Sequence, residues 1–315
     1  MMKSEVIWDQ KYRPTKLDKC ILPFRIKHIF KTYLEKGVIE DNLILSGPPG
    51  LGKTTIAKAM MEELDAEYIF VNASLHGNID TLRDLVQGFV TKVSLDGGRK
   101  YVIFDEAEKM TSATQDAMKA FIEENSKMTG FIFTCNIKSM ITGPLLSRLN
   151  LIDFTVNPKE RAILMKSFYK RILEILDTEE IPYIEKDIVD FMASNKNSLD
   201  FRKFIGQIQM ASKFGEINAE SLKNQTQQHL EELMPMLKEK DFNSTRKWLT
   251  EHPELGAQDL YREFYDLAYA FLKPQSIPQL VLTLGKYQYQ NAFVMDQEIN
   301  TAAFLVEVMV DCEFL

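Results

Sequence analysis

Eight residues near the start of the sequence have the composition and spacing of a phosphate-binding loop. Gly47 to Thr54 read GPPGLGKT and follow Leu43–Leu45, a short apolar run that is typical of a strand. Glycines allow consecutive backbone N–H groups to point at one phosphate, and the positive end of the following helix adds to the attraction. The pattern therefore predicts a loop that binds a nucleoside triphosphate. We expect its contacts to come from Gly47, Pro48, Pro49, Gly50, Leu51, Gly52, Lys53, Thr54 and Thr55.

Two carboxylates follow another apolar run, where a metal-binding strand would end. Tyr101–Phe104 reads as a strand and is followed directly by Asp105 and Glu106. Two acids here can also mark a solvated strand end, but the presence of the phosphate loop favours a role in metal binding and ATP hydrolysis. Asp105 would hold Mg²⁺ through water, and Glu106 would orient or activate the water that attacks the γ-phosphate. Lys53 would reach the β and γ oxygens and Thr54 would ligate the metal, so ATP and Mg²⁺ are the expected cofactors.

A polar side chain at the end of a further run completes the predicted site. Phe131–Thr134 reads as a strand, and Asn136 follows it after Cys135. A strand placed between the two motif strands would bring Asn136 within hydrogen-bonding reach of the γ-phosphate or the attacking water. An asparagine after a strand is otherwise most often a turn residue. We predict that Asn136 contacts the nucleotide, with the turn as the alternative.

The elements that must position these residues alternate along the first half of the chain. Short apolar runs that read as strands are separated by amphipathic stretches that read as helices. Such alternation is typical of an α/β fold, here a parallel five-stranded sheet with helices on both faces. The strands are expected at Leu43–Leu45, Tyr68–Val71, Tyr101–Phe104, Phe131–Thr134 and Leu151–Phe154.

Strand signals stop at Asn157 and Pro158, and the rest of the sequence reads as helices. At 315 residues the chain is too long for one ordinary core, since domains usually hold roughly 100–200 residues. We therefore predict an α/β domain at 1–156, a small helical domain at 157–226 and a second helical domain at 227–315. In the last part we expect a break near Gly285–Asn291 and a buried closing helix at Ala292–Val310.

Composition and charge exclude several classes of protein. No apolar run approaches the roughly 18 residues that span a bilayer, and the start lacks a secretory signal, so we expect a cytoplasmic protein without a membrane partner. Cys20, Cys135 and Cys312 are too few for a disulfide framework and are expected to be buried thiols. The net charge is −7, but residues 226–315, with 7 basic and 14 acidic side chains, hold all the excess acid. The neutral remainder can still present a basic face to nucleic acid.

Several motifs together resemble the AAA+ ATPases, and in particular their clamp-loader branch. The opening Trp8–Pro14 reads WDQKYRP and is similar to the segment that packs around the adenine in clamp-loader subunits. Pro144–Arg148 resembles the stretch whose arginine reaches the γ-phosphate bound by the neighbouring subunit, although Leu149 replaces the usual cysteine. Leu199–Lys203 resembles the start of a lid helix whose arginine contacts the γ-phosphate of its own subunit, although the usual glycine is Leu199. The resemblance implies that Lys11, Tyr12, Arg13 and Pro14 surround the adenine. It also implies that Arg148 contacts the γ-phosphate of a neighbouring subunit and that Arg202 contacts the γ-phosphate of its own subunit.

The same resemblance suggests residues that contact partners. Phe70–Ser74 is similar to the second strand of the family, and Thr114–Met118 to a helix that faces DNA. Basic residues near helix starts would contact DNA phosphates without reading bases, although a solvated helix charge is individually the commoner case. Apolar residues between the second and third strands would contact a clamp, although core packing explains most of them. The candidates are Arg83, Lys109 and Lys119 for DNA, Gln115 and Asn78 for coupling between sites, and Phe89 for the clamp.

Resemblance to the clamp-loader family implies an AAA+ P-loop sheet domain, a helical lid and a C-terminal helical collar. Such subunits form a pentameric spiral that contains several copies of one chain together with a different subunit. The spiral grips a ring-shaped sliding clamp when ATP is bound. Primer–template DNA then triggers hydrolysis and release. Size, a short collar and the lack of zinc cysteines most resemble the large subunits of T-even-type bacteriophages, which implies DNA replication in the host cytoplasm. The alternatives are another AAA+ motor, such as a branch-migration helicase or an unfoldase, which lacks the opening KYRP, and a non-hydrolysing scaffold subunit, against which Lys53, Glu106 and Asn136 argue.

Overall fold

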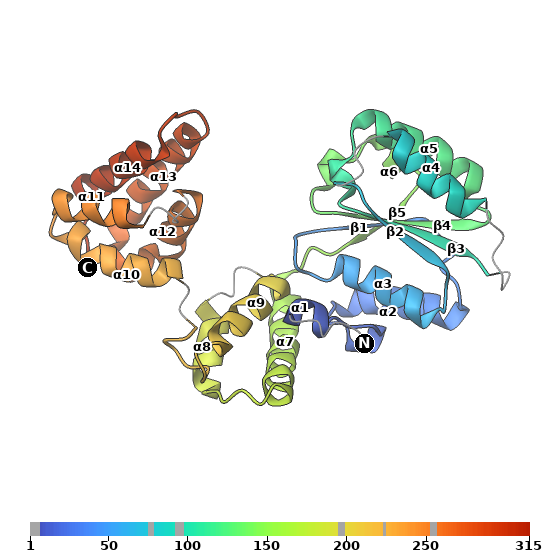
Figure 1. The fold of residues 1–315 in the computed structure, drawn as a ribbon, viewed down its shortest axis with the longest axis horizontal. Helices are drawn as coiled ribbons and strands as arrows, with labels where there is room; N and C mark the ends of the chain where they lie inside the picture. Colours follow the sequence, from blue (N-terminus) through green and yellow to red (C-terminus); the bar gives the residue numbers. More distant parts are fainter. Residues whose placement is uncertain (1–6, 75–78, 92–97, 195–198, 223–224, 253–256) are drawn as a thin grey trace. The chain divides into compact units, whose positions relative to one another are not determined.

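A computed structural model of the chain describes residues 7–74, 79–91, 98–194, 199–222, 225–252 and 257–315. The chain divides into two compact units, Met1–Leu222 and Lys223–Leu315. The first unit holds a β-sheet, the helices that cover it and a further group of helices, and the second is helical (Figure 1). No helix among the described residues is long and apolar enough to cross a membrane.

Five parallel strands form the sheet in the order β2-β3-β4-β1-β5, which confirms the predicted sheet. The strands are β1 (Leu43–Ser46), β2 (Tyr68–Asn72), β3 (Lys100–Asp105), β4 (Thr129–Cys135) and β5 (Asn150–Asp153). Strands β1, β3 and β4 are buried along almost their whole length, as expected of central strands covered on both faces. Because β4 lies between β1 and β3, the carboxyl ends of the three strands bring the phosphate loop, Asp105 and Asn136 together.

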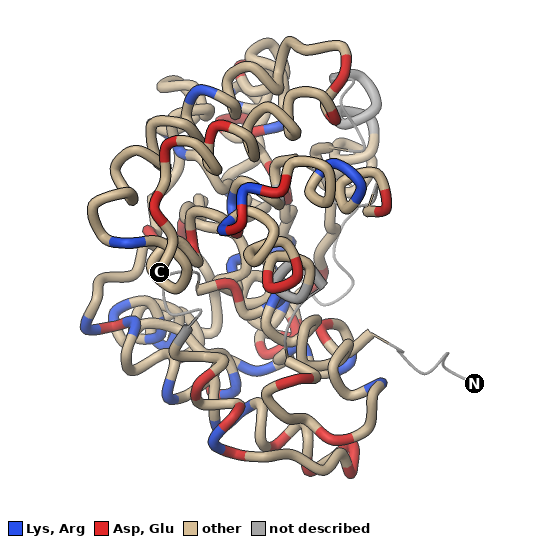
Figure 2. The backbone as a smooth tube through the Cα atoms, turned by 90° about the vertical axis from the view of Figure 1, so that its left-hand side faces the viewer, with Lys and Arg blue, Asp and Glu red and all other residues tan. Residues whose placement is uncertain are grey.

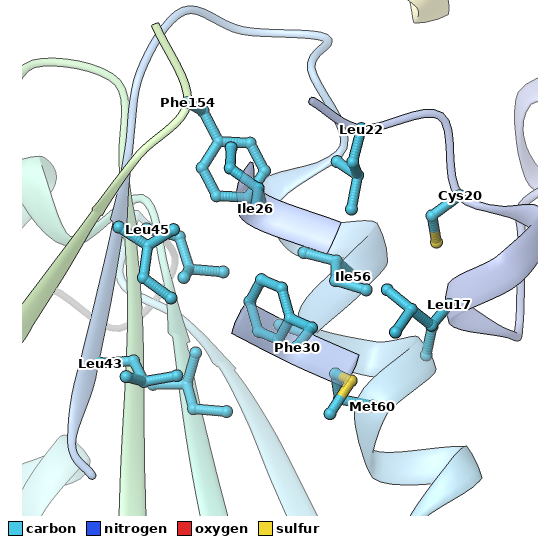
Figure 3. Packing of buried hydrophobic residues seen from close by; sticks show 14 of the residues in the cluster. Leu17, Cys20, Leu22, Ile26, Phe30, Leu43, Leu45, Ile56, Met60 and Phe154 are labelled. Atoms are coloured by element: carbon cyan, nitrogen blue, oxygen red, sulfur yellow. The ribbon is translucent and has the colours of Figure 1, made fainter. Parts of the chain in front are cut away.

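Helices cover both faces of the sheet (Figure 1). One face carries α2 (Phe24–Lys36) and α3 (Lys53–Glu63), and the other carries α4 (Ile79–Val90), α5 (Ser112–Asn125) and α6 (Gly143–Leu146). Figure 3 shows Phe30 and Ile56 from the first pair of helices near Leu45 of β1. On the other face Phe104 and Phe133 stack with ring centroids 4.7 Å apart. Burying one such side chain stabilises the fold by about 1.5–3 kcal/mol, so these two apolar layers hold the strand ends in place.

A further group of helices in the first unit, called the lid below, follows the sheet. It comprises α7 (Pro158–Thr178), α8 (Glu185–Ser194) and α9 (Phe201–Ser212). Helix α7 begins at a capping box, in which the side chains of Asn157 and Glu160 each accept a hydrogen bond from the backbone N–H of the other. Buried lid side chains also pack around Trp8 of the short helix α1 (Trp8–Lys11). Trp8 of α1 is therefore part of the lid core.

The second unit, as far as it is described, consists of helices around one apolar core. They are α10 (Gln225–Lys238), α11 (Phe242–Glu251), α12 (Ala257–Phe271), α13 (Ile277–Asn291) and α14 (Gln297–Asp311). A short 3₁₀ turn, η4 (Pro274–Ser276), precedes α13. The first unit also has 3₁₀ turns at η1 (Leu17–Lys19), η2 (Ala107–Lys109) and η3 (Lys138–Met140). The break expected near Gly285–Asn291 lies at the end of that range, because α13 continues through Gly285 and ends at Asn291. Leu284 and Tyr287 are buried in the core on either side of the glycine, and their packing overrides its low helix propensity.

The closing helix also differs from the sequence-based expectation. It begins at Gln297 rather than at 292, because the Asp296 side chain accepts hydrogen bonds from two backbone N–H groups of the first turn and so caps the helix there. Phe304 and Val308 are fully buried, but Ile299 and Val310 are exposed, so the helix is buried on one side only.

All three cysteines are free and buried, as predicted. Burial raises the pKa of the Cys20 thiol to about 12 and that of Cys312 to about 11. Both side chains are therefore thiols at neutral pH and pack as small apolar groups.

Candidate nucleotide-binding site

The predicted phosphate loop connects the end of β1 to the start of α3. Gly50 and Gly52 have φ values of +75° and +83°, in the left-handed region that costs other residues about 1–2 kcal/mol. Gly50 is also required by a close approach, because a Cβ there would lie 1.9 Å from Oδ1 of Asp200. The backbone N–H of Phe201 donates to the Gly50 carbonyl over 3.3 Å. The loop thus touches the first residues of lid helix α9 directly.

Lys53 is held inside the loop that precedes it. Only 6% of the residue is exposed, and its Nζ donates to the carbonyls of Gly47 (2.6 Å) and Pro48 (2.8 Å) and to Oδ1 of Asn136 (2.9 Å). Burial lowers the pKa of the Lys53 ammonium, and the charge of Glu108 is among those that oppose this shift. Phosphate oxygens are the natural replacement for these carbonyl acceptors, because they hydrogen-bond an ammonium more strongly.

Hydroxyl and carboxylate oxygens meet beside the loop. Oδ1 of Asp105 accepts hydrogen bonds from the hydroxyls of Thr54 and Thr134, both over 2.6 Å. The Thr134 hydroxyl in turn accepts from the backbone N–H of Glu106 at 3.3 Å, and Glu106 has a left-handed φ of +57°. Thr134 therefore holds both acids across the neighbouring strands. Hard oxygen donors from a hydroxyl and one carboxylate fit Mg²⁺, which takes few protein ligands and keeps its remaining positions for water and phosphate.

Asn136 lies between two charged groups. Its Oδ1 faces Lys53, whereas its backbone N–H and its Nδ2 donate to Oε1 of Glu108 over 3.1 and 2.8 Å. Its side chain also lines the cavity of the site. Neither Thr134 nor Glu108 was predicted as a site residue. The one sequence signal for them is their position, because Thr134 lies near the end of β4 and Glu108 lies three residues after the end of β3.

A cavity of about 210 Å³ lies between the sheet domain and the lid. Its apolar part is lined by Ile21, Phe168, Phe201 and Ile205, which suits the flat face of a nucleobase. Arg171, which the sequence did not suggest as a site residue, also lines the cavity. Its guanidinium donates a hydrogen bond to the carbonyl of Tyr12 over 3.2 Å. The predicted residues that line the cavity are Tyr12, Arg13, Pro14, Pro49, Gly50, Gly52, Lys53, Thr54, Thr55, Asp105, Glu106, Asn136 and Arg202.

Four other predicted nucleotide contacts do not line this cavity. Lys11 pairs with Glu179 of α7 at 2.7 Å, which raises the pKa of the lysine. Gly47 and Pro48 direct their carbonyls at Lys53, and Leu51 is buried in the core.

The two predicted arginines occupy different places. Arg202 lines the cavity, and its Nε lies 3.6 Å from Oδ2 of Asp9 in α1. Arg148 does not line the cavity; it follows α6, is exposed, and its Nε donates to Oε1 of Glu123 in α5 over 2.6 Å. Arg148 therefore lies on the surface, outside the cavity of its own chain.

Gln115 joins elements around the site. Only 2% of it is exposed, its Nε2 donates to the carbonyls of Met110 (3.2 Å) and Met140 (3.1 Å), and its Oε1 accepts from the backbone N–H of Thr142 (2.7 Å). The start of α5 is thereby tied to the segment that follows Asn136.

The candidates for partner contacts are scattered over the sheet domain. Lys109 is exposed and Lys119 is half-buried, and Figure 2 shows basic and acidic residues interspersed along the backbone. Phe89 is half-buried against Lys100, whose Nζ lies 4.7 Å from the ring centroid, while Leu85 is 43% exposed. The side chain of Arg83 and the whole of Asn78 lie outside the described residues.

Comparison with known proteins gives matches along the whole chain. Residues 43–156 match a family described as "ATPase family associated with various cellular activities (AAA)". The chain is 31% identical over 318 residues to the sliding-clamp-loader large subunit of Enterobacteria phage T4, covering 99% of this chain and 98% of that protein. The subunit of the same name from Escherichia phage RB69 is 35% identical over 247 residues, 77% of each chain. The replication factor C small subunit of Sulfolobus acidocaldarius is 28% identical over 330 residues, with 99% and 98% covered.

Among solved structures, a mutant of RuvB from Thermotoga maritima superposes with a TM-score of 0.52 at 17% identity, covering 67% of this chain and 71% of that chain. This similarity shows the fold alone. The phosphate loop, the paired acids and the family match together define an ATPase of the AAA class. More narrowly, the near full-length similarity to the phage proteins shows that the chain belongs to the family of sliding-clamp-loader large subunits.

Proposed function

We propose that this chain binds and hydrolyses ATP in order to load a sliding clamp onto primer–template DNA. One observation carries the proposal. The cavity between sheet and lid is lined by Lys53, Asp105, Glu106, Asn136 and Arg202 together, in a chain that resembles clamp-loader large subunits from end to end. The host-cell cytoplasm is the location that this function implies for a phage protein.

Each side chain has a role that its position supports. Lys53 and the loop amides would bind the β- and γ-phosphates, while Thr54 and Asp105 would hold Mg²⁺, which neutralises phosphate charge when bound. Glu106 would orient the attacking water and accept its proton. Asn136 and Arg202 would contact the γ-phosphate, and Tyr12, Arg13 and Pro14 would enclose the adenine. Catalysis would then rest on position and charge rather than on covalent chemistry.

Arg148 is proposed to act in trans on the nucleotide of a neighbouring subunit. Its exposure, and its absence from the lining of its own cavity, support this role. An arginine supplied in this way is worth roughly 10³–10⁵ in rate, so an isolated chain should be nearly inactive. We infer a pentameric spiral of several copies with a different subunit, assembled through the C-terminal helices as a collar.

Partner contacts are proposed on the sheet domain. Arg83, Lys109 and Lys119 would contact the DNA backbone without base specificity, and Phe89 would contact the clamp. Gln115 would couple DNA binding to the site, since it joins the start of α5 to the segment after Asn136. Asn78 would restrain Glu106 until DNA binds. We also propose that the ATPase domain ends at residue 156, that the lid comprises residues 157–226 and that the collar comprises residues 227–315.

An ATPase assay with partner subunits, with and without clamp and primer–template DNA, tests the function. The proposed function requires stimulation by clamp plus DNA. Hydrolysis stimulated by DNA without a clamp would instead favour a branch-migration motor, and nucleotide binding without any hydrolysis would favour a scaffold subunit.

Mixing two inactive variants tests the trans role. A Lys53→Ala chain cannot hydrolyse its own ATP but still offers Arg148, and an Arg148→Ala chain has the converse defect. Mixed assemblies should regain part of the activity that each variant lacks. Lys31→Ala, which removes an exposed cation from α2, is the matched control and should hydrolyse normally. The role in trans is refuted if no mixing ratio restores hydrolysis while both variants still assemble.

A further inference from the structure

A buried glutamate lies next to the site without a role in the proposed reaction. Glu108 is in the 3₁₀ turn η2, two residues after Glu106, and only 6% of it is exposed. Its Oε1 accepts both hydrogen bonds that Asn136 donates, and its Oε2 is buried without a partner among the described residues. Burying a carboxylate carries a large desolvation cost, and a neutral side chain could close a turn without it. The position of this charge therefore calls for an explanation.

The two neighbours of Asn136 determine which way its amide points. Its Oδ1 lies 2.9 Å from the Lys53 ammonium, which can only donate, and its Nδ2 lies 2.8 Å from the Glu108 carboxylate, which accepts when ionised. A flipped amide would place a donor against the ammonium and an acceptor against the carboxylate. Only one orientation satisfies both charged groups, and it leaves the second N–H of Nδ2 available for another acceptor.

Glu108 acts on the cavity through Asn136 rather than directly. Asn136 and Glu106 line the cavity, whereas Glu108 does not. Both hydrogen bonds that Oε1 accepts come from Asn136, one from its side chain and one from its backbone. The carboxylate thus holds both the end of β4 and the amide that follows it.

We propose that Glu108 is a positioning residue for ATP hydrolysis, fixing the Asn136 amide so that its free N–H points at the γ-phosphate or the attacking water. This inference rests on the proposed function, because it assigns Asn136 to the nucleotide. A purely structural Glu108, which only fastens η2 to β4, is the competing account. The two accounts differ in what the turnover number does when folding and ATP binding are intact.

Steady-state ATPase of the assembled complex separates them. Glu108→Ala and Asn136→Ala should each lower kcat about 100- to 1,000-fold, the scale for losing one preorganised hydrogen-bond donor, while KM for ATP changes less than about threefold. Glu108→Gln keeps an acceptor oxygen and should lose less. The double variant Glu108→Ala/Asn136→Ala should be no slower than the slower single variant, because both changes remove the same contact. Glu124→Gln, on the exposed surface of α5, is the matched control and should retain full activity.

The proposal is overturned if Glu108→Ala keeps kcat within about twofold of the parent protein, or if the double variant shows the product of the two single losses. If Glu108→Ala does not fold, Glu108→Gln with and without Asn136→Ala gives the same cycle. Basal hydrolysis suffices for these comparisons. Absence of stimulation by clamp and DNA would therefore defeat the proposed function and leave the coupling of Glu108 to Asn136 separately measurable.

Discussion

Replacing Gly50 with alanine should force the phosphate loop and the lid apart. A Cβ at this position would lie 1.9 Å from Oδ1 and 2.8 Å from Cα of Asp200, distances that real Cβ atoms do not reach. Asp200 would have to move, which breaks its cap on the backbone N–H of Lys203 (3.0 Å) and the hydrogen bond from Phe201 to the Gly50 carbonyl. Each of these is worth about 1 kcal/mol. The left-handed φ of +75° adds about 1–2 kcal/mol, so the total loss is about 3–4 kcal/mol.

Gly52→Ala is the matched control. Its φ of +83° imposes the same backbone strain, but the nearest atom to its Cβ would be Cδ2 of Leu22 at 3.8 Å, an ordinary contact. Gly52→Ala should therefore lose only about 1–2 kcal/mol. The two variants should differ by about 2 kcal/mol, or about 4–8 °C in the melting temperature of a unit the size of Met1–Leu222.

Thermal unfolding without nucleotide measures this difference, and hydrogen exchange at the start of α9 locates it. Gly50→Ala should lose protection at the Phe201 and Lys203 amides, whereas Gly52→Ala should keep it. Adding Asp200→Ser to Gly50→Ala should restore part of the stability, because serine is smaller and still caps the helix. Equal melting temperatures for the two alanine variants, with equal protection of α9, would refute the contact between loop and lid.

Further predictions concern the neighbouring groups. Thr134→Val removes a hydrogen bond to the Asp105 carboxylate worth about 1.5–3 kcal/mol. In a titration of ATPase activity, the Mg²⁺ concentration for half-maximal activity should therefore rise about 10- to 100-fold, and Thr134→Ser should largely avoid this rise. Asp9→Asn releases Arg202 from a surface ion pair worth about 0.2–1 kcal/mol, so equilibrium titration should show ATP binding tightened up to about fivefold, with ADP unchanged. Cys20, with its pKa raised to about 12, should react with iodoacetamide at pH 8 only after unfolding; rapid labelling of the native chain would contradict its burial.

Local patterns were enough to predict the sheet and most of the residues around the cavity. Each of the five strands was recognisable from a short apolar run, and the observed bounds differ by at most two residues at either end. Gly47 to Thr54 could be recognised because loop, lysine and threonine are contiguous in sequence and need no distant partner to be identified. Asp105 and Asn136 were recognisable because each lies at the carboxyl end of a strand.

Propensity failed where burial of neighbouring side chains decided the outcome. Gly285 and the polar residues after it suggested a break, but Leu284 and Tyr287 fall on the buried side of one continuous helix. The start of the last helix depended on which acid caps it, and Asp296 does so. Both outcomes depend on contacts with other helices or on backbone geometry that a linear pattern does not contain.

By itself, then, the sequence determined that a phosphate loop, two acids and an asparagine follow three strands of one parallel sheet. Only the tertiary structure decided that Thr134 bridges Asp105 and Glu106, that Glu108 orients Asn136, and that Arg171 enters the cavity from the lid. The physical reason is the strand order. β4 lies between β3 and β1, so side chains about thirty residues apart in sequence come within hydrogen-bonding distance, and no single segment records that proximity.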